Sequence, residues 1–258
     1  MSSVWRKIFR TAPRNAETMD YQDVDVLIPF RPCGDHCRED NADFIEAHLR
    51  NALPGARITR CDDDDPELFN RGRAVNQGAA VTSRPIMVIA DGDVWLPPGA
   101  LREATNILRR QFGLQRSYIV PFNKIIWMDG AWRRKVLDGG VSIASRPPAR
   151  HVILEWGQRS HGICNVVRRE KFEEFGGFDP RFRGWGCEDE AWNLAAETLG
   201  GPKLRLQAEG RHLYHPSCPS KEDPERMARI GHLHQRYAGA HGNRAKMAEL
   251  IAERNTPL

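Results

Sequence analysis

Two carboxylates separated by a single glycine are the feature of this sequence with the clearest chemical potential. The apolar run Ile86–Ala90 is followed directly by Asp91, Gly92 and Asp93. The run predicts a buried strand that ends where the charges begin, because an unpaired buried carboxylate is costly. The carboxylates therefore stand at the carboxyl end of a strand, where open α/β sheets bind ligands. Such oxygen ligands suit Mg²⁺ or Mn²⁺ carrying a phosphate. The alternative is a turn whose Asp residues cap the next helix.

Two other acidic groups follow predicted strands or open predicted helices. The run Asp62 to Asp65 follows the second expected strand, and one of its members, for which we select Asp63, could contact a nucleoside. Otherwise the run is solvated surface. Glu188 and Asp189 follow a Gly-Trp-Gly turn that contains Trp185. A carboxylate in a partly apolar cleft can have a raised pKa and act as a general base. Both carboxylates could equally serve to stabilise the positive end of the dipole of the helix that they begin.

Basic and imidazole side chains offer complementary chemistry. Arg71 and Arg73 lie on a predicted helix, where they could hold a diphosphate or form a solvated face. His212 and His215 are separated by two residues. One imidazole joining the two Asp residues would favour Mn²⁺ over Ca²⁺. The sequence leaves open which of the two histidines would bind.

The elements that must position these residues alternate regularly in the first half. We expect strands at 24–30, 56–61 and 86–90 and helices at 41–53, 66–81 and 98–112. This alternation indicates an α/β fold in which helices flank a central, mostly parallel mixed sheet. The second half is less regular. We expect strands at 118–122, 124–128, 162–167 and 203–207, helices at 169–175 and 188–199, a long loop at 139–161, and a charged helical segment from 224 that is broken near 239–242.

The composition is that of a soluble globular protein. Of 258 residues, 40% are hydrophobic and 28% are charged, and no run approaches the roughly 20 apolar residues that cross a bilayer. Residues 1–21 lack the apolar core of a secretory signal and read as a flexible tail. The net charge of +4 is mild and dispersed, so no nucleic-acid partner is expected. The six cysteines form no paired zinc signature, and reduced thiols in a cytoplasm fit best.

Five short segments, taken in order, resemble glycosyltransferases of the GT-A fold. The resemblance is to the β-1,4-galactosyltransferase group and to the related galactosaminyltransferases and chondroitin-polymerase-like enzymes. It covers residues 22 to 232. The segments are Ile28-Pro29-Phe30-Arg31, Phe69-Asn70-Arg71, Asp91-Gly92-Asp93, Gly176-Gly177-Phe178-Asp179 followed by Gly184-Trp185-Gly186-Cys187-Glu188-Asp189, and His215 followed by Pro224-Glu225-Arg226.

The resemblance implies a single GT-A domain over 22–232, between the tail 1–21 and a helical tail 233–258. It implies a metal-dependent transfer from a nucleotide-sugar, a UDP-sugar, to a hydroxyl of a glycan, lipid-linked glycan or protein. Mn²⁺ (or Mg²⁺) would be held by Asp91, Asp93 and His215, with Asp93 in direct contact and Asp91 turned toward the nucleotide. Donor-binding residues would be Pro29, Phe30, Arg31, Asp63, Arg71, Asp91, Gly162 and Trp185. Asp189 would be the base, and Glu188 would orient hydroxyls.

Three departures from the family pattern qualify these expectations. Cys187 replaces the second glycine of the family's motif, and no second arginine follows Arg31 closely. The membrane anchor of the Golgi members has no counterpart, which implies a cytoplasmic enzyme of bacterial or phage type.

The loop from 139 to 160 is long enough to be a lid that closes over the donor.

Other functions share these residues. The Glu-Asp pair favours inversion over a retaining reaction of the same fold. A nucleotidyltransferase on a similar sheet would release pyrophosphate and not a nucleoside diphosphate. A module that only binds carbohydrate or nucleic acid would show no turnover.

Overall fold

The computed structural model of the 258-residue chain describes residues 20–63, 65, 67–110, 116–157, 162–184, 186–216 and 223–255. Most of the expected tail 1–21 lies outside these residues. Tyr21, at its end, is fully buried, and the Arg109 guanidinium lies 4.5 Å from the centre of its ring. Tyr21 is therefore part of the main apolar core.

The central sheet has six strands in the order β2-β1-β3-β8-β5-β9. Their bounds are Val24–Pro29 (β1), Arg57–Cys61 (β2), Ile86–Ala90 (β3), Ile119–Val120 (β5), Cys164–Arg168 (β8) and Leu204–Arg205 (β9). β1 pairs in parallel with β2 and β3, whereas β8 runs antiparallel to both of its neighbours. β9 is parallel to β5. The expectation of a mostly parallel mixed sheet in an α/β protein is confirmed.

A second sheet of four strands has the order β4-β10-β6-β7. Its strands are Val94–Trp95 (β4), Lys124–Met128 (β6), Val152–Trp156 (β7) and Glu209–His212 (β10). β10 pairs antiparallel with β4, and this register sets His212 opposite Val94. The backbone amide of Leu213 also donates to the carbonyl of Asp93 at 2.8 Å. Pairing of two strands far apart in the sequence thus brings a histidine to the Asp-x-Asp segment.

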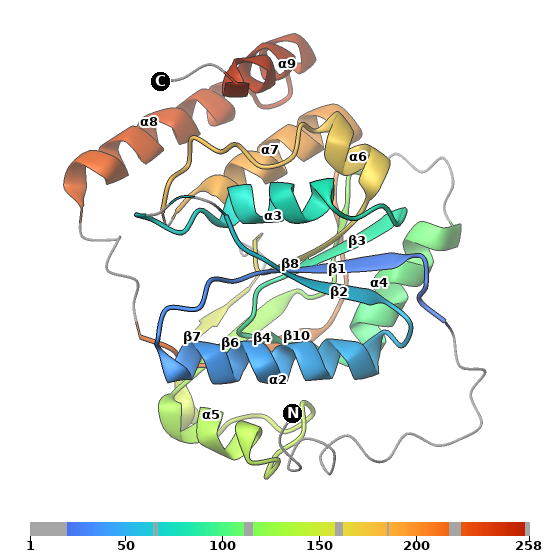
Figure 1. The fold of residues 1–258 in the computed structure, drawn as a ribbon, viewed down its shortest axis with the longest axis vertical. Helices are drawn as coiled ribbons and strands as arrows, with labels where there is room; N and C mark the ends of the chain where they lie inside the picture. Colours follow the sequence, from blue (N-terminus) through green and yellow to red (C-terminus); the bar gives the residue numbers. More distant parts are fainter. Residues whose placement is uncertain are drawn as a thin grey trace.

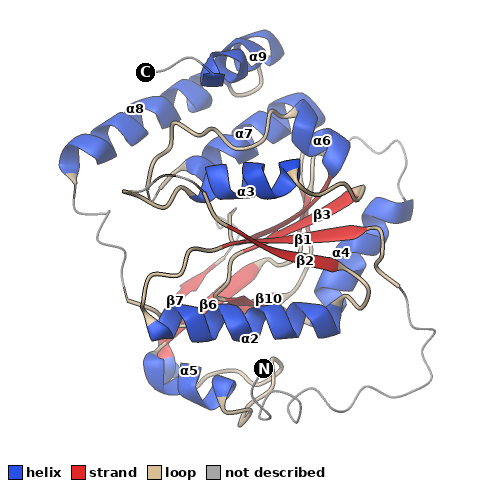
Figure 2. Ribbon diagram, viewed as in Figure 1, coloured by secondary structure: helices blue, strands red, loops and turns tan. Residues whose placement is uncertain are grey.

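Helices cover both faces of the central sheet (Figures 1 and 2). α2 (His36–Ala52) lies on one side of β1–β3 and contacts α4 (Pro98–Arg110), whereas α3 (Arg71–Ala80) and α7 (Glu188–Gly200) lie on the other. α8 (Pro224–Ala240) and α9 (Arg244–Ala252) form a further layer that packs on α7. The remaining helices are α5 (Gly130–Leu137), α6 (Arg169–Glu174) and the 3₁₀ turns Ala149–His151 and Glu253–Asn255. None of the described helices combines the length and the apolar character needed to cross a bilayer.

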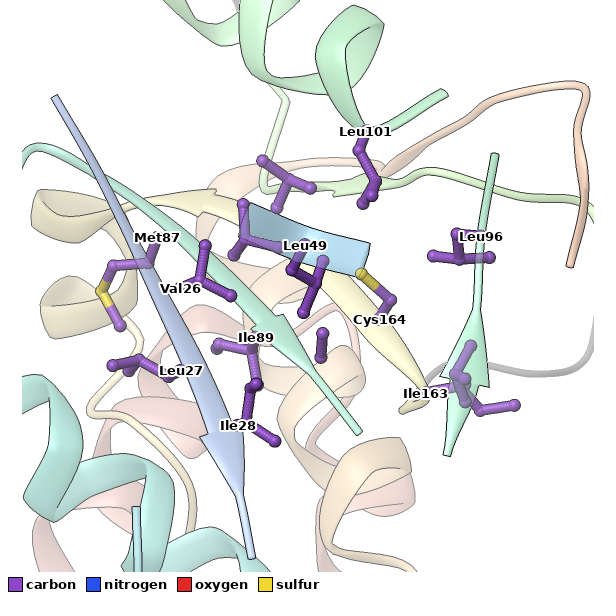
Figure 3. Close-up of a cluster of buried hydrophobic side chains, with 14 of the residues drawn as sticks. Val26, Leu27, Ile28, Leu49, Met87, Ile89, Leu96, Leu101, Ile163 and Cys164 are labelled. Carbon is purple, nitrogen blue, oxygen red and sulfur yellow. The ribbon is translucent and has the colours of Figure 1, made fainter. Parts of the chain in front are cut away.

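The main core lies where the central strands meet α2 and α4 (Figure 3). Every residue of β1 and β3 is buried, as expected for parallel strands covered on both faces. Val26 and Ile89 belong to one cluster with Leu49 of α2 and Leu101 of α4. This apolar packing ends at Ala90, and the carboxylates of the next residues therefore emerge at the edge of the core.

Several boundaries differ from the sequence-based expectations. The helix predicted at 66–81 begins at Arg71, because the Asn70 side chain caps it by accepting from the backbone amide of Arg73 at 3.0 Å. The helix predicted at 41–53 begins earlier, at His36, behind an Asp35 cap. The expected loop 139–161 is wrong in part, because residues 152–156 form β7 and pair with β6. Residues 158–160 of the expected lid lie outside the described residues, and closure of the segment over the donor stays a prediction.

The C-terminal helices are not separate from the domain. The expected boundary after residue 232 falls inside α8. Ile230, Leu233 and Tyr237 pack in a second apolar cluster with Phe182 and with α7 residues such as Ala195. The position of the helix break near 239–242 is confirmed, because α8 ends at Ala240 and α9 begins at Arg244.

The close packing of α3 on β2 gives a stability prediction. A Cβ added at Gly78 would overlap the Cys61 sulfur and come within 3.4 Å of Leu27. We expect Gly78→Ala to lower the free energy of unfolding by about 1–3 kcal/mol, the usual cost of overpacking a core. Gly231→Ala, inside α8 with no atom within 4 Å of the added Cβ, should raise it by about 0.5–1 kcal/mol. Urea denaturation measures both; equal effects of the two substitutions would contradict this packing.

Candidate active site

The Arg71 guanidinium connects three segments that are distant in the sequence. Its Nε donates to Asp91 Oδ1 at 2.7 Å, and its Nη2 donates to the Gly162 carbonyl at 2.5 Å. Its Nη1 lies 3.9 Å from Glu188 Oε1. The guanidinium also covers the ring of Phe178 at 5.4 Å. One cation therefore joins the end of β3, the segment before β8 and the start of α7.

The carboxylates around Arg71 have displaced pKa values. Burial and the neighbouring Asp189 raise the pKa of Glu188 to about 7, against the opposing effect of Arg71. Burial likewise raises the pKa of Asp91 to about 6, although Arg71 lowers it. Burial alone would lower the pKa of Arg71, but Asp91, Glu188 and Asp189 raise it. The group thus holds a permanent cation and carboxyls that titrate near neutral pH.

Asp93 belongs to a different group, with His212 and His215. One potential ligand atom from each of these residues lies within 4.8 Å of the other two. His215 Nε2 is 3.1 Å from Asp93 Oδ2, and His212 Nε2 is 3.6 Å from Asp93 Oδ1. Burial alone would raise the pKa of Asp93, but the two imidazoles lower it to about 2. The two carboxylates of the Asp-x-Asp segment are therefore not equivalent.

The hydrogen bonds of this second group fit a metal site. His215 Nδ1 lies 2.7 Å from the Pro216 carbonyl. A proton on Nδ1 satisfies that carbonyl, so Nε2 is the ring nitrogen that faces Asp93 and that can bind a metal ion when it is deprotonated. His212 stacks on Trp127 at 3.6 Å, and its Nδ1 is buried, so Nε2 is the nitrogen that faces Asp93. A carboxylate and two imidazoles are a donor set that suits a divalent transition-metal ion.

Side chains of α2 hold the segment that carries His215. Asn41 Nδ2 donates to the Tyr214 carbonyl at 3.0 Å, and Arg38 Nη2 donates to the Pro216 carbonyl at 2.8 Å. Arg133 Nε in turn donates to Asn41 Oδ1 at 2.6 Å. The Pro216 carbonyl therefore accepts from both Arg38 and His215. α2 thus orients the His215 imidazole through the backbone.

The start of α7 brings Asp189 beside Gly162. A Cβ at Gly162 would overlap the Asp189 carboxyl group, so only glycine permits this approach. Gly184, Gly186 and Cys187 all have positive φ, and Cys187, at φ 64°, is the one described non-glycine residue to do so. Glycine adopts this left-handed conformation more readily than any residue with a side chain. Trp185, the expected sugar-stacking residue, lies outside the described residues.

The proposed nucleoside side is built from β1 and the acidic run after β2. Pro29 is buried and Phe30 is half-buried at the end of β1. Arg31 donates to Asp62 Oδ1 at 2.8 Å and, through Nη2, to Asp63 Oδ1 at 2.6 Å. Asp63 Oδ2 is buried and accepts no hydrogen bond from the residues that the structure describes. The donor-binding roles of Pro29, Phe30, Arg31 and Asp63 stay predictions.

The sequence-predicted residues therefore separate into neighbouring groups. Arg71 joins Asp91, Glu188 and Gly162, and Gly162 adjoins Asp189; Asp93 pairs with both histidines. The metal role of Asp91 stays a prediction, because its carboxylate accepts from Arg71. The sequence did not indicate that Asn70, the N-cap of α3, and Asn76, within α3, would hold the segment before α7. Asn70 Nδ2 donates to the Pro180 carbonyl and Asn76 Nδ2 to that of Phe178; only the capping preference of Asn70 gave a signal.

Comparison with known proteins adds similarity of structure alone. No family model matches the chain, and no curated protein sequence does. Among solved structures, Drosophila β-1,4-galactosyltransferase 7, as a mutant with manganese, UDP-Gal and xylobiose, superimposes with a TM-score of 0.47 at 16% identity, over 80% of this chain and 79% of that one. The catalytic domain of the same enzyme with xylobiose gives 0.46 at 16%, over 77% of each chain. GalNAc-T7 with UDP, GalNAc and Mn²⁺ gives 0.47 at 12%, over 90% of this chain and 55% of that one.

The raised pKa of Glu188 predicts how stability depends on pH. The value of about 7 lies above the ordinary 4.5, so the folded protein holds a proton that the unfolded chain releases. The stability from this proton is fully present below pH 4.5 and is lost as the pH rises through 7. Glu188→Gln should therefore flatten the decline in the free energy of unfolding measured with urea across this window.

Glu103→Gln is the matched control, because Glu103 is an exposed helical glutamate of α4. It should keep the wild-type pH dependence. Parallel curves for wild type and Glu188→Gln would contradict the assignment of the proton to Glu188.

Proposed function

We propose that this protein is a metal-dependent glycosyltransferase that moves a sugar from a UDP-sugar to an acceptor hydroxyl with inversion at the anomeric carbon. One observation carries the proposal: Arg71 joins Asp91 to Glu188 and Gly162, next to the group formed by Asp93 and two histidines. A candidate base, a permanent cation and a candidate metal site thereby adjoin one another at the carboxyl edge of the sheet. Transfer with a charged leaving group needs all three.

Asp93 and His215 would hold a divalent metal ion, Mn²⁺ or Mg²⁺. The lowered pKa of Asp93 keeps its carboxylate ionised, and the hydrogen bond at His215 Nδ1 leaves Nε2 for the metal. His212 is the third group within ligand distance, and Asp91 is the alternative from the sequence. When bound, the ion supplies positive charge to the departing diphosphate as a Lewis acid.

Donor binding would use the cationic and acidic groups around the edge of β1 and α3. Arg31 braces the loop of Asp62 and Asp63, and the free Asp63 Oδ2 offers an acceptor to a nucleoside. Pro29 and Phe30 would form the wall beside the base, and Trp185 would stack on a sugar face. Arg71 keeps its charge at any physiological pH and would face the diphosphate or the donor sugar.

Asp189 would act as the general base on the acceptor. Its carboxylate would take the proton from the acceptor hydroxyl, and that oxygen would form a bond to the anomeric carbon. The bond between this carbon and the diphosphate oxygen breaks on the opposite face, and nucleoside diphosphate leaves with the electron pair. Glu188, held near Arg71, would orient the hydroxyls of donor or acceptor. Gly162 would leave room for the reacting sugar beside Asp189.

A retaining glycosyltransferase and a nucleotidyltransferase are the competing reactions. A retaining enzyme would give the opposite anomeric configuration, which NMR of the product reports. A nucleotidyltransferase would release pyrophosphate and not a nucleoside diphosphate. The acceptor, a glycan, a lipid-linked glycan or a protein, is part of the proposal only as a hydroxyl-bearing molecule.

Turnover of nucleotide-sugars tests the reaction. Incubation with a panel of UDP- and other nucleotide-sugars plus Mn²⁺ should release nucleoside diphosphate from at least one of them. Asp189→Asn should lower kcat by about a hundredfold or more while UDP still binds, because a general base contributes about 10²–10⁴. Glu190→Gln, the exposed neighbour, should keep full turnover. Pyrophosphate as the product, or an unchanged rate in Asp189→Asn, would contradict the proposal.

Metal binding by itself tests the ligand set. Asp93→Ala and His215→Ala should each weaken the binding of Mn²⁺, measured by calorimetry with UDP present, by about tenfold or more. A similar loss in His212→Ala would assign His212 as a ligand, whereas wild-type affinity would limit it to its stacking on Trp127. His36→Ala is the control, because that side chain is 94% exposed. Wild-type affinity in both Asp93→Ala and His215→Ala would exclude this site.

A further inference from the structure

Arg254, near the C-terminus, contacts the glycine-rich turn that leads to the candidate catalytic residues. Its Nη1 donates to the carbonyls of Gly176 and Gly177 at 2.7 and 2.8 Å, and to that of Phe175 at 3.4 Å. Gly176 and Gly177 have φ of 74° and 66°. Glycines in this left-handed region are free to leave it. Their conformation therefore depends on what holds their carbonyls.

Arg254 is itself held in place by Asp179, farther along the same segment. Arg254 Nε donates to the Tyr237 hydroxyl at 2.9 Å, and this hydroxyl donates to Asp179 Oδ2 at 2.8 Å. Arg181 Nη2 pairs with the same carboxylate oxygen at 2.8 Å. The side chains of Arg254 and Asp179 are only 5% and 1% exposed. Charged hydrogen bonds buried to this extent are strong and directional.

The opposite side of the segment is held by α3, the helix that carries Arg71. Asn76 Oδ1 accepts from the Phe178 amide at 2.9 Å, and Asn76 Nδ2 donates to the Phe178 carbonyl at 2.8 Å. The Phe178 ring stacks on Trp192 of α7 at 5.3 Å and lies under the Arg71 guanidinium. The segment 176–183 is thus clamped between α3 and the C-terminal helices just before Glu188 and Asp189.

We propose that Arg254 is a positioning residue of the active site: by holding the carbonyls of Gly176 and Gly177 it sets where the segment 184–189 presents Glu188 and Asp189. The α8–α9 pair is then part of the catalytic unit. Arg254 touches neither donor nor acceptor. The effect on turnover rests on the proposed function, whereas the effect on the conformation of the segment does not.

Cys187 provides a readout of this segment without any assay of activity. It is half-buried, caps α7 and directly precedes Glu188. Burial and the nearby Asp189 raise the pKa of its thiol to about 11, so alkylation in the native protein should be slow. Cys33 is exposed and serves as an internal reference in the same molecule. Site-resolved mass spectrometry follows both thiols during labelling with iodoacetamide.

The test compares full-length Arg254→Ala with Arg236→Ala. Arg236 pairs with Glu253 Oε2 at 2.6 Å on the same helical layer. Among the described residues its guanidinium donates to that carboxylate and not to the carbonyls of the turn. We expect Arg254→Ala to raise the labelling rate of Cys187 about tenfold, the effect of losing charged hydrogen bonds, with Cys33 unchanged. Arg236→Ala should leave both rates unchanged.

Turnover gives the second readout. Arg254→Ala should lower kcat about tenfold to a hundredfold, as expected for misplaced catalytic groups, with KM for the donor unchanged. Arg254→Lys, which keeps a positive charge that can donate hydrogen bonds, should partly restore the wild-type labelling rate of Cys187 and the wild-type kcat. If Arg254→Ala does not fold, Tyr237→Phe removes the hydroxyl that links Arg254 to Asp179 and keeps the packed ring.

The outcomes separate the two proposals. If the wild-type protein has no transferase activity but Cys187 is still labelled faster in Arg254→Ala than in wild type, the effect of Arg254 on the segment is supported and the proposed function is overturned. Unchanged labelling with active enzyme would overturn the positioning role alone. If Arg236→Ala accelerates the labelling of Cys187 as much as Arg254→Ala does, the inference is overturned. It is also overturned if Arg254→Ala lowers only the thermal stability, because Arg254 is then a structural residue.

Discussion

The half-buried guanidinium of Arg71 is the contact on which the candidate site depends. A buried cation is tolerated only when carboxylates and carbonyls satisfy it. Here the partners come from the end of β3, the segment before β8 and the start of α7. Each of these elements belongs to a different part of the chain, so satisfying one cation aligns all three. The same charge limits how far the pKa values of Asp91 and Glu188 rise.

The two carboxylates of the Asp-x-Asp segment face opposite environments although one glycine separates them. Asp91 accepts from Arg71, while Asp93 lies against two imidazoles. The first carboxyl has a raised pKa and the second a lowered one. A cation from α3 thus serves one residue and leaves the other to the β10 side of the site. Under the proposed function, this separation would let one short turn contribute to nucleotide contacts and to a metal site at once.

The C-terminal helices belong to the same cooperative structure. Their apolar residues pack with Phe182 and α7, and Arg254, in the 3₁₀ turn that follows α9, reaches the turn at 176–179. Through that turn they connect to α3, where Asn70 and Asn76 hold the neighbouring carbonyls. A helix pair that reads as a charged tail in the sequence is therefore a support for the segment that precedes Glu188.

The sequence by itself determined the elements with strong local signals. Apolar runs identified β3 and, despite the single charged residue Asp25, β1. The period of α4 was clear, and the change from Ala90 to Asp91 located the candidate site at a strand end. β4, β10 and the end of the expected 139–161 loop gave no such signal, because two- to five-residue strands owe their existence to pairing with distant partners. Only the tertiary structure decided that His212 and His215 both reach Asp93, since the register of β10 against β4 brings them there. It alone also decided the contacts of Arg254, because hydrogen bonds between segments about 80 residues apart leave no periodic trace in the sequence.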